Sequence, residues 1–113
     1  MSRKNNLLSI GDVSKLTGAS VRSLRYYEKI GILTPAYISP DSNYRYYSKE
    51  QMPIVEMIML CIELDIPLSE LAKVANPISS RPFLEQVRKT AEGKLDGLRR
   101  GLELMDAVER KMN

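Results

Sequence analysis

The stretch Ser9–Leu33, SIGDVSKLTGASVRSLRYYEKIGIL, predicts two short helices joined by a tight turn. Ser9 and Asp12 have the spacing of a capping box, in which a serine oxygen and an acid three residues later bond each other's backbone N–H groups at a helix start. Gly18 is placed to end the first helix in the left-handed conformation, and Ser20 caps the second. Two short helices joined by a three- or four-residue turn that contains glycine are typical of a helix-turn-helix.

The second helix is expected to run to Ile30 and stop at Gly31, with Val21 and Leu24 as candidates for burial. Its outward face carries charged and hydroxyl side chains, namely Arg22, Arg25, Tyr26 and Lys29. Such a face can enter a DNA major groove and contact the flanking phosphates. The same pattern also fits a solvated helix in a domain that never meets nucleic acid.

Composition excludes several classes of protein. The 113 residues are 43% hydrophobic and 27% charged, which fits one small domain with an appendage. We expect a cytoplasmic protein, because no apolar run is long enough to span a membrane and no secretory leader is recognisable. The single cysteine, Cys61, and the absence of histidine leave no parts for a disulfide, a zinc site or a Ser/His or Cys/His nucleophile system. We therefore predict no enzyme activity, no metal site and no cofactor.

Charge and tyrosine are concentrated in the same part of the chain. Residues 1–50 hold eight Lys and Arg against four Asp and Glu, whereas residues 51–80 hold one against four. All six tyrosines lie between Tyr26 and Tyr47, inside the basic part. A basic segment interleaved with aromatic hydroxyls is typical of a surface that binds a polyanion, although charge alone is a weak sign.

Residues 36–48, AYISPDSNYRYYS, predict a small β-hairpin, or wing. Ala36–Ile38 and Tyr44–Tyr47 have the pattern of extended runs, and the residues between them are strong turn formers. Tyr46 is expected to be mainly structural. The candidate phosphate contacts at or near the tip are Asn43, Tyr44 and Arg45.

Two further helices are expected before residue 76. Ser48–Gln51 repeats the capping-box pattern ahead of an apolar helix, and Pro67 precedes a shorter one. The first of these helices is apolar through Ile54, Ile58, Cys61, Ile62 and Leu64, and in the second the side chains expected to face inward are Leu68, Leu71 and Val74. These elements complete a first domain that we place at residues 7–76.

Residues 81–113 predict one long helix with an apolar line at intervals of seven. So small a body cannot bury this line, so we expect a partner helix and a homodimer. The candidate dimerisation residues are Leu84, Ala91, Leu95, Leu98, Leu102, Met105 and Val108. Gly93, Gly97 and Gly101 add a second line at intervals of four, which indicates either a close backbone approach or a locally frayed helix.

The first stretch, the segment NYRYYSKEQ and the terminal helix together resemble the MerR family of transcription regulators across nearly the whole chain. The hairpin PAYISPDSNYRYYS resembles the multidrug-responsive, BmrR-like subgroup. The resemblance implies a mainly α fold: a winged helix-turn-helix with a small β-hairpin wing and a long C-terminal helix that forms an antiparallel coiled coil. The candidate DNA-binding residues are then Ser20, Val21, Arg22, Arg25, Tyr26, Lys29, Asn43, Tyr44, Arg45, Tyr47 and Lys49.

The resemblance also implies a function. Members of the family typically bind pseudo-palindromic promoter operators as homodimers and activate by bending and untwisting the DNA for RNA polymerase. Metal-sensing members carry cysteines near the end of the dimerisation helix, and this chain has none there. Drug-sensing members continue into a ligand domain after the long helix, so we expect either a fragment or a regulator without its own effector domain. The alternatives are an architectural or excisionase-type DNA-binding protein and a coiled-coil adaptor.

Overall fold

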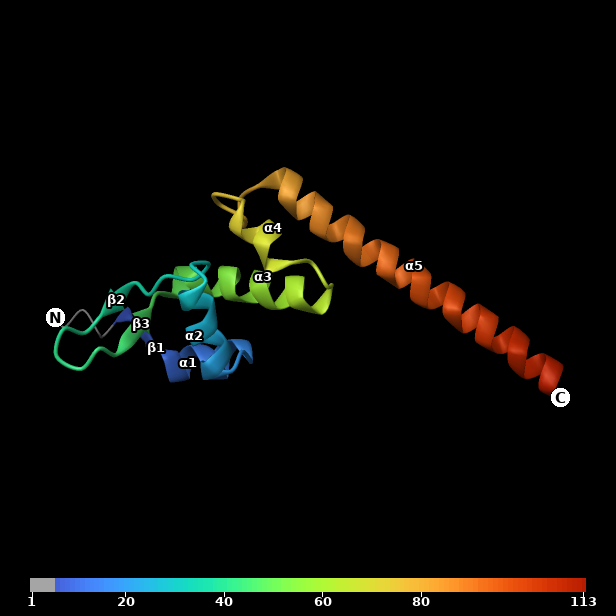
Figure 1. Ribbon diagram of the computed structural model, residues 1–113, viewed down its shortest axis with the longest axis horizontal. Coiled ribbons are helices and arrows are strands. Elements are labelled where there is room, and N and C mark those ends of the chain that lie inside the picture. The colour runs from blue at the N-terminus through green and yellow to red at the C-terminus, as the bar shows by residue number, and fades with distance from the viewer. Residues whose placement is uncertain (1–5) are drawn as a thin grey trace. The chain divides into compact units, whose positions relative to one another are not determined.

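The computed structural model describes residues 6–113, which divide into two compact units: the first ends at Ile78 and the second spans Ser79–Asn113. The fold is mainly helical with a small sheet, as predicted. Its elements, shown in Figure 1, are β1 (Leu8–Ser9), α1 (Ile10–Thr17), α2 (Val21–Lys29), β2 (Tyr37–Ile38), β3 (Arg45–Tyr47), the 3-10 turn η2 (Lys49–Gln51), α3 (Met52–Glu63), α4 (Leu68–Ala72) and α5 (Arg81–Met112).

The local signals at the helix ends have the predicted geometry. Ser9 Oγ accepts from the Asp12 backbone N–H at 3.0 Å, and Asp12 Oδ2 accepts from the Ser9 N–H at 3.1 Å, which confirms the first capping box. Gly18 and Gly31 close α1 and α2 with φ angles of 86° and 83°, a conformation that costs glycine little because it has no Cβ. These ends set the short turn between α1 and α2.

The sheet has three antiparallel strands in the order β1-β3-β2, one more than the sequence predicted. Leu8 pairs with Tyr47 across β1 and β3, and Tyr37 pairs with Tyr46 across β2 and β3. A strand of two residues shows no alternation of polar and apolar side chains, so β1 leaves no recognisable pattern in the sequence. Its pairing attaches the start of α1 to the wing.

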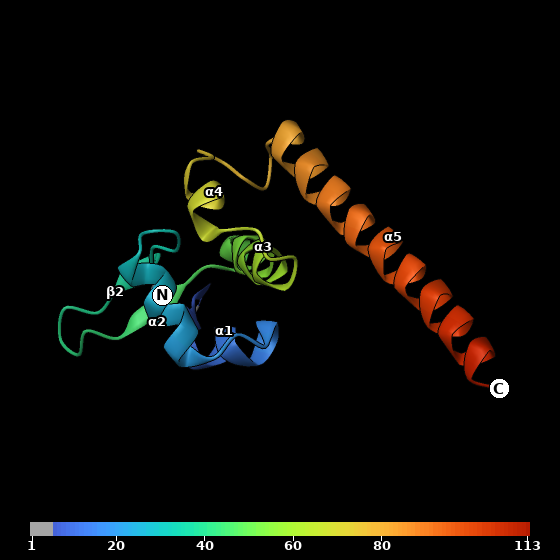
Figure 2. The same cartoon turned by 45° about the vertical axis from the view of Figure 1, so that its right-hand side comes forward.

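One core joins the elements of the first unit. Helix α1 contacts α2, α3 and β3, and Figure 2 shows α1, α2 and α3 within this unit. The buried side chains of these elements form a common core. Its members without exposed surface include Val13, Leu24, Tyr47, Val55, Ile58 and Cys61. Among the apolar residues that the sequence placed along α3, Ile58 and Cys61 have no exposed surface, whereas 49% of Ile62 is exposed. A helix that is apolar along most of its length, as α3 is, shows too little contrast for its buried face to be chosen from sequence.

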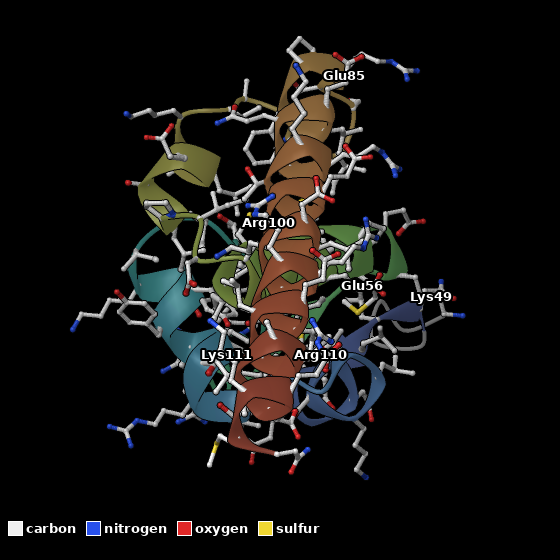
Figure 3. The ribbon with its side chains drawn as sticks, turned by 90° about the vertical axis from the view of Figure 1, so that its right-hand side faces the viewer. Lys49, Glu56, Glu85, Arg100, Arg110 and Lys111 are labelled. Carbon is white, nitrogen blue, oxygen red and sulfur yellow. The ribbon has the colours of Figure 1, made fainter. Side chains whose placement is uncertain are left out.

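The second unit is built on one uninterrupted helix of 32 residues, α5. Ser80 caps it by accepting from the Phe83 backbone N–H at 3.4 Å. Phe83 and Val87 near its start are buried, whereas the apolar side chains further along are exposed, among them Leu95, Leu98, Leu102, Met105 and Val108. Arg100, Arg110 and Lys111 project from the same helix (Figure 3). Within residues 6–113, no helix combines the length and apolar character needed to cross a membrane.

Candidate nucleic-acid interface

Helix α2 sorts its residues by periodicity into a buried and an exposed side. Leu24 and Tyr27 are buried, and Tyr26 is 52% exposed although it is next to Tyr27 in the chain. The exposed side also carries the three cations that the sequence predicted there, Arg22, Arg25 and Lys29. The two adjacent tyrosines therefore have different environments: Tyr27 packs in the core, and Tyr26 is exposed to solvent.

The first residues of α2 are occupied by capping. Ser20 is exposed, and its Oγ accepts from the Ser23 backbone N–H at 3.0 Å and lies 2.9 Å from the Ser23 hydroxyl. Val21, a candidate both for burial and for DNA contact, is half-buried.

The wing is a tight loop held by its own backbone. Ser39 N–H donates to the Tyr44 carbonyl at 2.9 Å, and Asn43 N–H donates to the Ser39 carbonyl at 2.8 Å. Ser39 is buried, Asn43 has a φ of 61°, and Tyr44 is 67% exposed. Asparagine tolerates this left-handed conformation better than most residues. The loop therefore presents Asn43 and Tyr44 at an ordered tip.

Arg45 links the wing to α2. Its Nε lies 3.2 Å from Glu28 Oε1 and its Nη2 lies 3.3 Å from Glu28 Oε2, while Nη1 donates to the Asn43 carbonyl at 2.7 Å. The two side chains are partly shielded, with 37% of Arg45 and 26% of Glu28 exposed. The guanidinium that was predicted to reach a phosphate is thus engaged within the protein.

A groove of about 740 Å³ runs between α2 and the wing. It brings together five of the predicted DNA-binding residues. The groove is lined by Ser9, Ile10, Arg25, Glu28, Lys29, Ser42, Asn43, Tyr44, Arg45 and Tyr46. Three of these side chains are cationic and one is anionic, so the groove has a net positive charge that attracts an anionic ligand.

Tyr47 was predicted to contact DNA from the wing, and this prediction is wrong. Tyr47 has no exposed surface, and among the described residues its hydroxyl has no hydrogen-bond partner. Side chains alternate along a strand, so Tyr47 shares with Arg45 the face of β3 that meets the helices. Burial raises the pKa of Tyr47, Glu28 raises it further, and Arg45 and Arg25 oppose the shift. Tyr46, on the other face, packs against Tyr37 with ring centroids 6.0 Å apart, in keeping with its expected structural role.

Lys49 lies outside the lining of the groove. It is exposed in η2, and its side chain points outward (Figure 3). The turn that carries it is fixed by Gln51, whose Oε1 accepts from the Ser48 N–H at 2.9 Å and whose Nε2 donates to the Thr34 carbonyl at 2.6 Å. Lys49 is therefore an exposed cation on an ordered turn.

Glu28 is a member of the site that was not predicted from the sequence. A signal for it exists: it is the one acid in α2, on a helix whose exposed side is otherwise basic. Across residues 6–113, no group of three or more His, Cys, Asp and Glu side chains is arranged to hold a metal ion. Apart from Glu28, the polar side chains of the site are cations, hydroxyls and one amide, the groups that recognise phosphate.

Comparisons with known proteins agree with this architecture. Residues 8–76 match the model of the MerR HTH family of regulatory proteins. The multidrug-efflux transporter 1 regulator of Bacillus subtilis is 37% identical over 112 residues, which cover 96% of this chain and 40% of that protein. The N-terminal part of MtaN, the B. subtilis multidrug transporter activator, superposes with a TM-score of 0.64 at 23% identity, over 93% of this chain and 97% of that one.

A second solved structure, EcmrR in complex with DNA, superposes with a TM-score of 0.61 at 27% identity, over 91% of this chain and 38% of that one. The chain spans about two-fifths of the length of the B. subtilis multidrug-efflux regulator. The family model, in contrast, covers well over half of this chain and includes both α2 and the wing. The chain belongs to the MerR family of helix-turn-helix regulatory proteins.

Proposed function

We propose that this protein is a sequence-specific DNA-binding transcription regulator that acts as a homodimer in the cytoplasm. The observation that carries the proposal is the groove between α2 and the wing, where Arg25 and Lys29 face Asn43 and Tyr44 across one positively charged surface. In this proposal residues 7–76 form the DNA-binding domain and residues 81–113 the dimerisation helix.

The exposed side of α2 has the composition that major-groove binding requires. Arg22 and Arg25 can donate paired hydrogen bonds to guanine or to phosphate, and Tyr26 adds a hydroxyl and a ring. In this proposal the wing tip and Lys49 contact the adjacent phosphate backbone. Contacts to phosphate fix the register of the helix on the duplex, while contacts to base edges provide the sequence preference.

Dimerisation supplies the spacing between two half-sites. At 1.5 Å per residue, the 32 residues of α5 extend about 48 Å, longer than the roughly 34 Å of one DNA turn. The exposed line from Leu95 to Val108 would be covered by the same line on a second copy. Two recognition helices held by such a pair would read a pseudo-palindromic operator.

Activation by DNA distortion completes the proposal. A rigid dimer that grips two half-sites can stabilise a bent and untwisted spacer, because the contacts to both halves offset a deformation cost of several kcal/mol. RNA polymerase is then the partner that uses the realigned promoter. This step draws on family membership and on relatives that are named as activators or efflux regulators.

The proposal is tested by footprinting on genomic DNA, followed by anisotropy titrations on the recovered sites. We expect protection of two related half-sites in a promoter spacer, one dimer per site by sedimentation, and affinity that falls steeply with salt. Binding sites scattered without relation to promoters would favour the architectural alternative. Absence of salt-dependent DNA binding would leave the adaptor alternative.

A further inference from the structure

The ion pair between Glu28 and Arg45 is not explained by the proposed function. Glu28 stands on the last turn of α2, a helix whose exposed side otherwise carries cations and a tyrosine. A carboxylate on a face that approaches phosphate repels it, so on charge alone Glu28 should weaken DNA binding. Its presence there calls for a structural reason.

The contacts of Arg45 supply that reason. Two of its nitrogens, Nε and Nη2, meet both carboxylate oxygens of Glu28 at 3.2 to 3.4 Å, the forked geometry that makes such pairs directional. Its third nitrogen, Nη1, donates to the Asn43 carbonyl at 2.7 Å. One guanidinium therefore joins the end of α2 to the tip of the wing.

The hydrogen bond from Arg45 reaches the wing at Asn43, a residue with an unusual backbone conformation. Its φ of 61° is uncommon for a residue other than glycine, and its N–H already bonds the Ser39 carbonyl. The carbonyl that Arg45 holds belongs to the residue whose N–H closes the turn. Loss of that bond would leave the orientation of Asn43 and Tyr44 less restricted relative to α2.

We propose that Glu28 is a positioning residue for DNA binding: it fixes Arg45 and, through it, the Asn43 turn, so that wing and α2 engage one duplex together. The inference rests on the proposed function. Arg45 acts on DNA through the wing rather than as a phosphate ligand of its own. The ion pair removes one net positive charge from the interface. It also orders the wing before DNA binds, which lowers the entropy cost of binding.

Glu28→Gln tests the proposal by the sign of its effect. Glutamine keeps the size of the side chain, removes the negative charge and weakens the grip on Arg45. If Glu28 merely repelled phosphate, the variant would bind an operator duplex more tightly. We expect the opposite, an affinity lower by roughly fivefold for each bound subunit. Glu56→Gln, the same change on the exposed side of α3 (Figure 3), is the matched control and should bind no more weakly than wild type.

Arg45→Lys provides a second, independent variant. Lysine keeps the charge that a phosphate contact needs, but its single nitrogen cannot form the fork to Glu28 and also hold Asn43. We expect a loss similar to that of Glu28→Gln, and a double variant little worse than either single one because both break the same unit. Full affinity in Arg45→Lys would identify Arg45 as a phosphate ligand and overturn the inference.

Hydrogen exchange provides a readout that needs no DNA. In the free protein the amide hydrogens of Ser39 and Asn43 should exchange faster in Glu28→Gln than in wild type or Glu56→Gln, with thermal stability nearly unchanged. Unchanged exchange together with tighter or equal DNA binding overturns the inference and leaves the proposed function intact, provided that wild type binds DNA. Wild-type protein that fails to bind DNA overturns both.

Discussion

Apolar side chains of similar types are buried in the first unit of the chain and largely exposed along α5 in the second. In the first unit Val13, Leu24 and Ile58 have no exposed surface, because short helices and a small sheet fold onto one another. In α5, Leu98 is 70% exposed and Leu102 is 68% exposed. A single helix has no second layer within its own length against which to bury an apolar line. One unit is therefore completed by its own chain, whereas the other has the surface of half an interface.

The largest effect is expected from Leu98→Asp, which tests the proposed need of α5 for a partner. A carboxylate in an apolar seam must be desolvated without a pairing group, so the dimer should dissociate. Operator affinity should fall by roughly a hundredfold, the equivalent of about 2.7 kcal/mol. Sedimentation and anisotropy measure the two quantities. Glu103→Asp, which places the same residue on another side of the helix, is the control, and a dimeric Leu98→Asp protein would contradict the coiled-coil assignment.

The next largest effect on DNA binding is expected from Arg22→Ala and Arg25→Ala. Both residues are exposed, so these changes alter the surface of the first unit without disturbing its core. If each side chain neutralises a phosphate, each variant should weaken binding to all DNA sequences. The slope of log affinity against log salt concentration should also become shallower by about one unit for every arginine removed from a bound subunit. A change confined to one operator position would instead indicate a base contact. Unchanged affinity and salt dependence in both variants would show that the exposed side of α2 is not the DNA-binding surface.

A smaller effect is expected from Gly97→Leu. Within the described chain, a Cβ at Gly97 would meet only the end of the Arg100 side chain at 4.0 Å, and at Gly93 or Gly101 it would meet nothing within 4 Å. Leucine should therefore stabilise an isolated α5 by somewhat less than about 1 kcal/mol. If a partner backbone approaches the glycine line, the same change should instead weaken the dimer. Sedimentation equilibrium decides by sign: a tighter dimer would mean that the line faces solvent.

The smallest effect is expected from Tyr47→Phe, which tests the burial of this residue in the first unit. Removing a buried hydroxyl without a partner should raise the free energy of unfolding by up to about 1 kcal/mol and leave DNA affinity unchanged. Reduced affinity without loss of stability would restore the original expectation of a DNA contact.

The same variant has a signature in pH. Because the pKa of Tyr47 is raised in the folded state, the folded protein keeps its proton when the unfolded chain loses it above about pH 10. This contribution to stability is present below that pH and is lost as pH rises through the folded pKa. Phenylalanine cannot ionise, so the variant should lose less stability than wild type in alkaline urea titrations. Parallel curves for the two proteins would argue against a perturbed Tyr47.

Local features of this protein could be predicted from its sequence, because they depend on residues a few positions apart. The capping boxes at Ser9 and Ser48, the left-handed glycines that end α1 and α2, and the cationic face of α2 all have the predicted geometry. The apolar line of α5 was equally readable, because helical periodicity places residues on one side without knowledge of any neighbour.

What each side chain faces depended instead on contacts between distant segments. Strand β1 exists because Leu8 meets Tyr47, far along the chain, and that pairing is not encoded in two residues. Tyr47 and Arg45 carry the chemistry of a DNA contact, but the face of β3 that they share lies against the helices, which buries one and pairs the other with Glu28. Residue type states what a side chain is able to bind, whereas packing in three dimensions selects the partner that it meets.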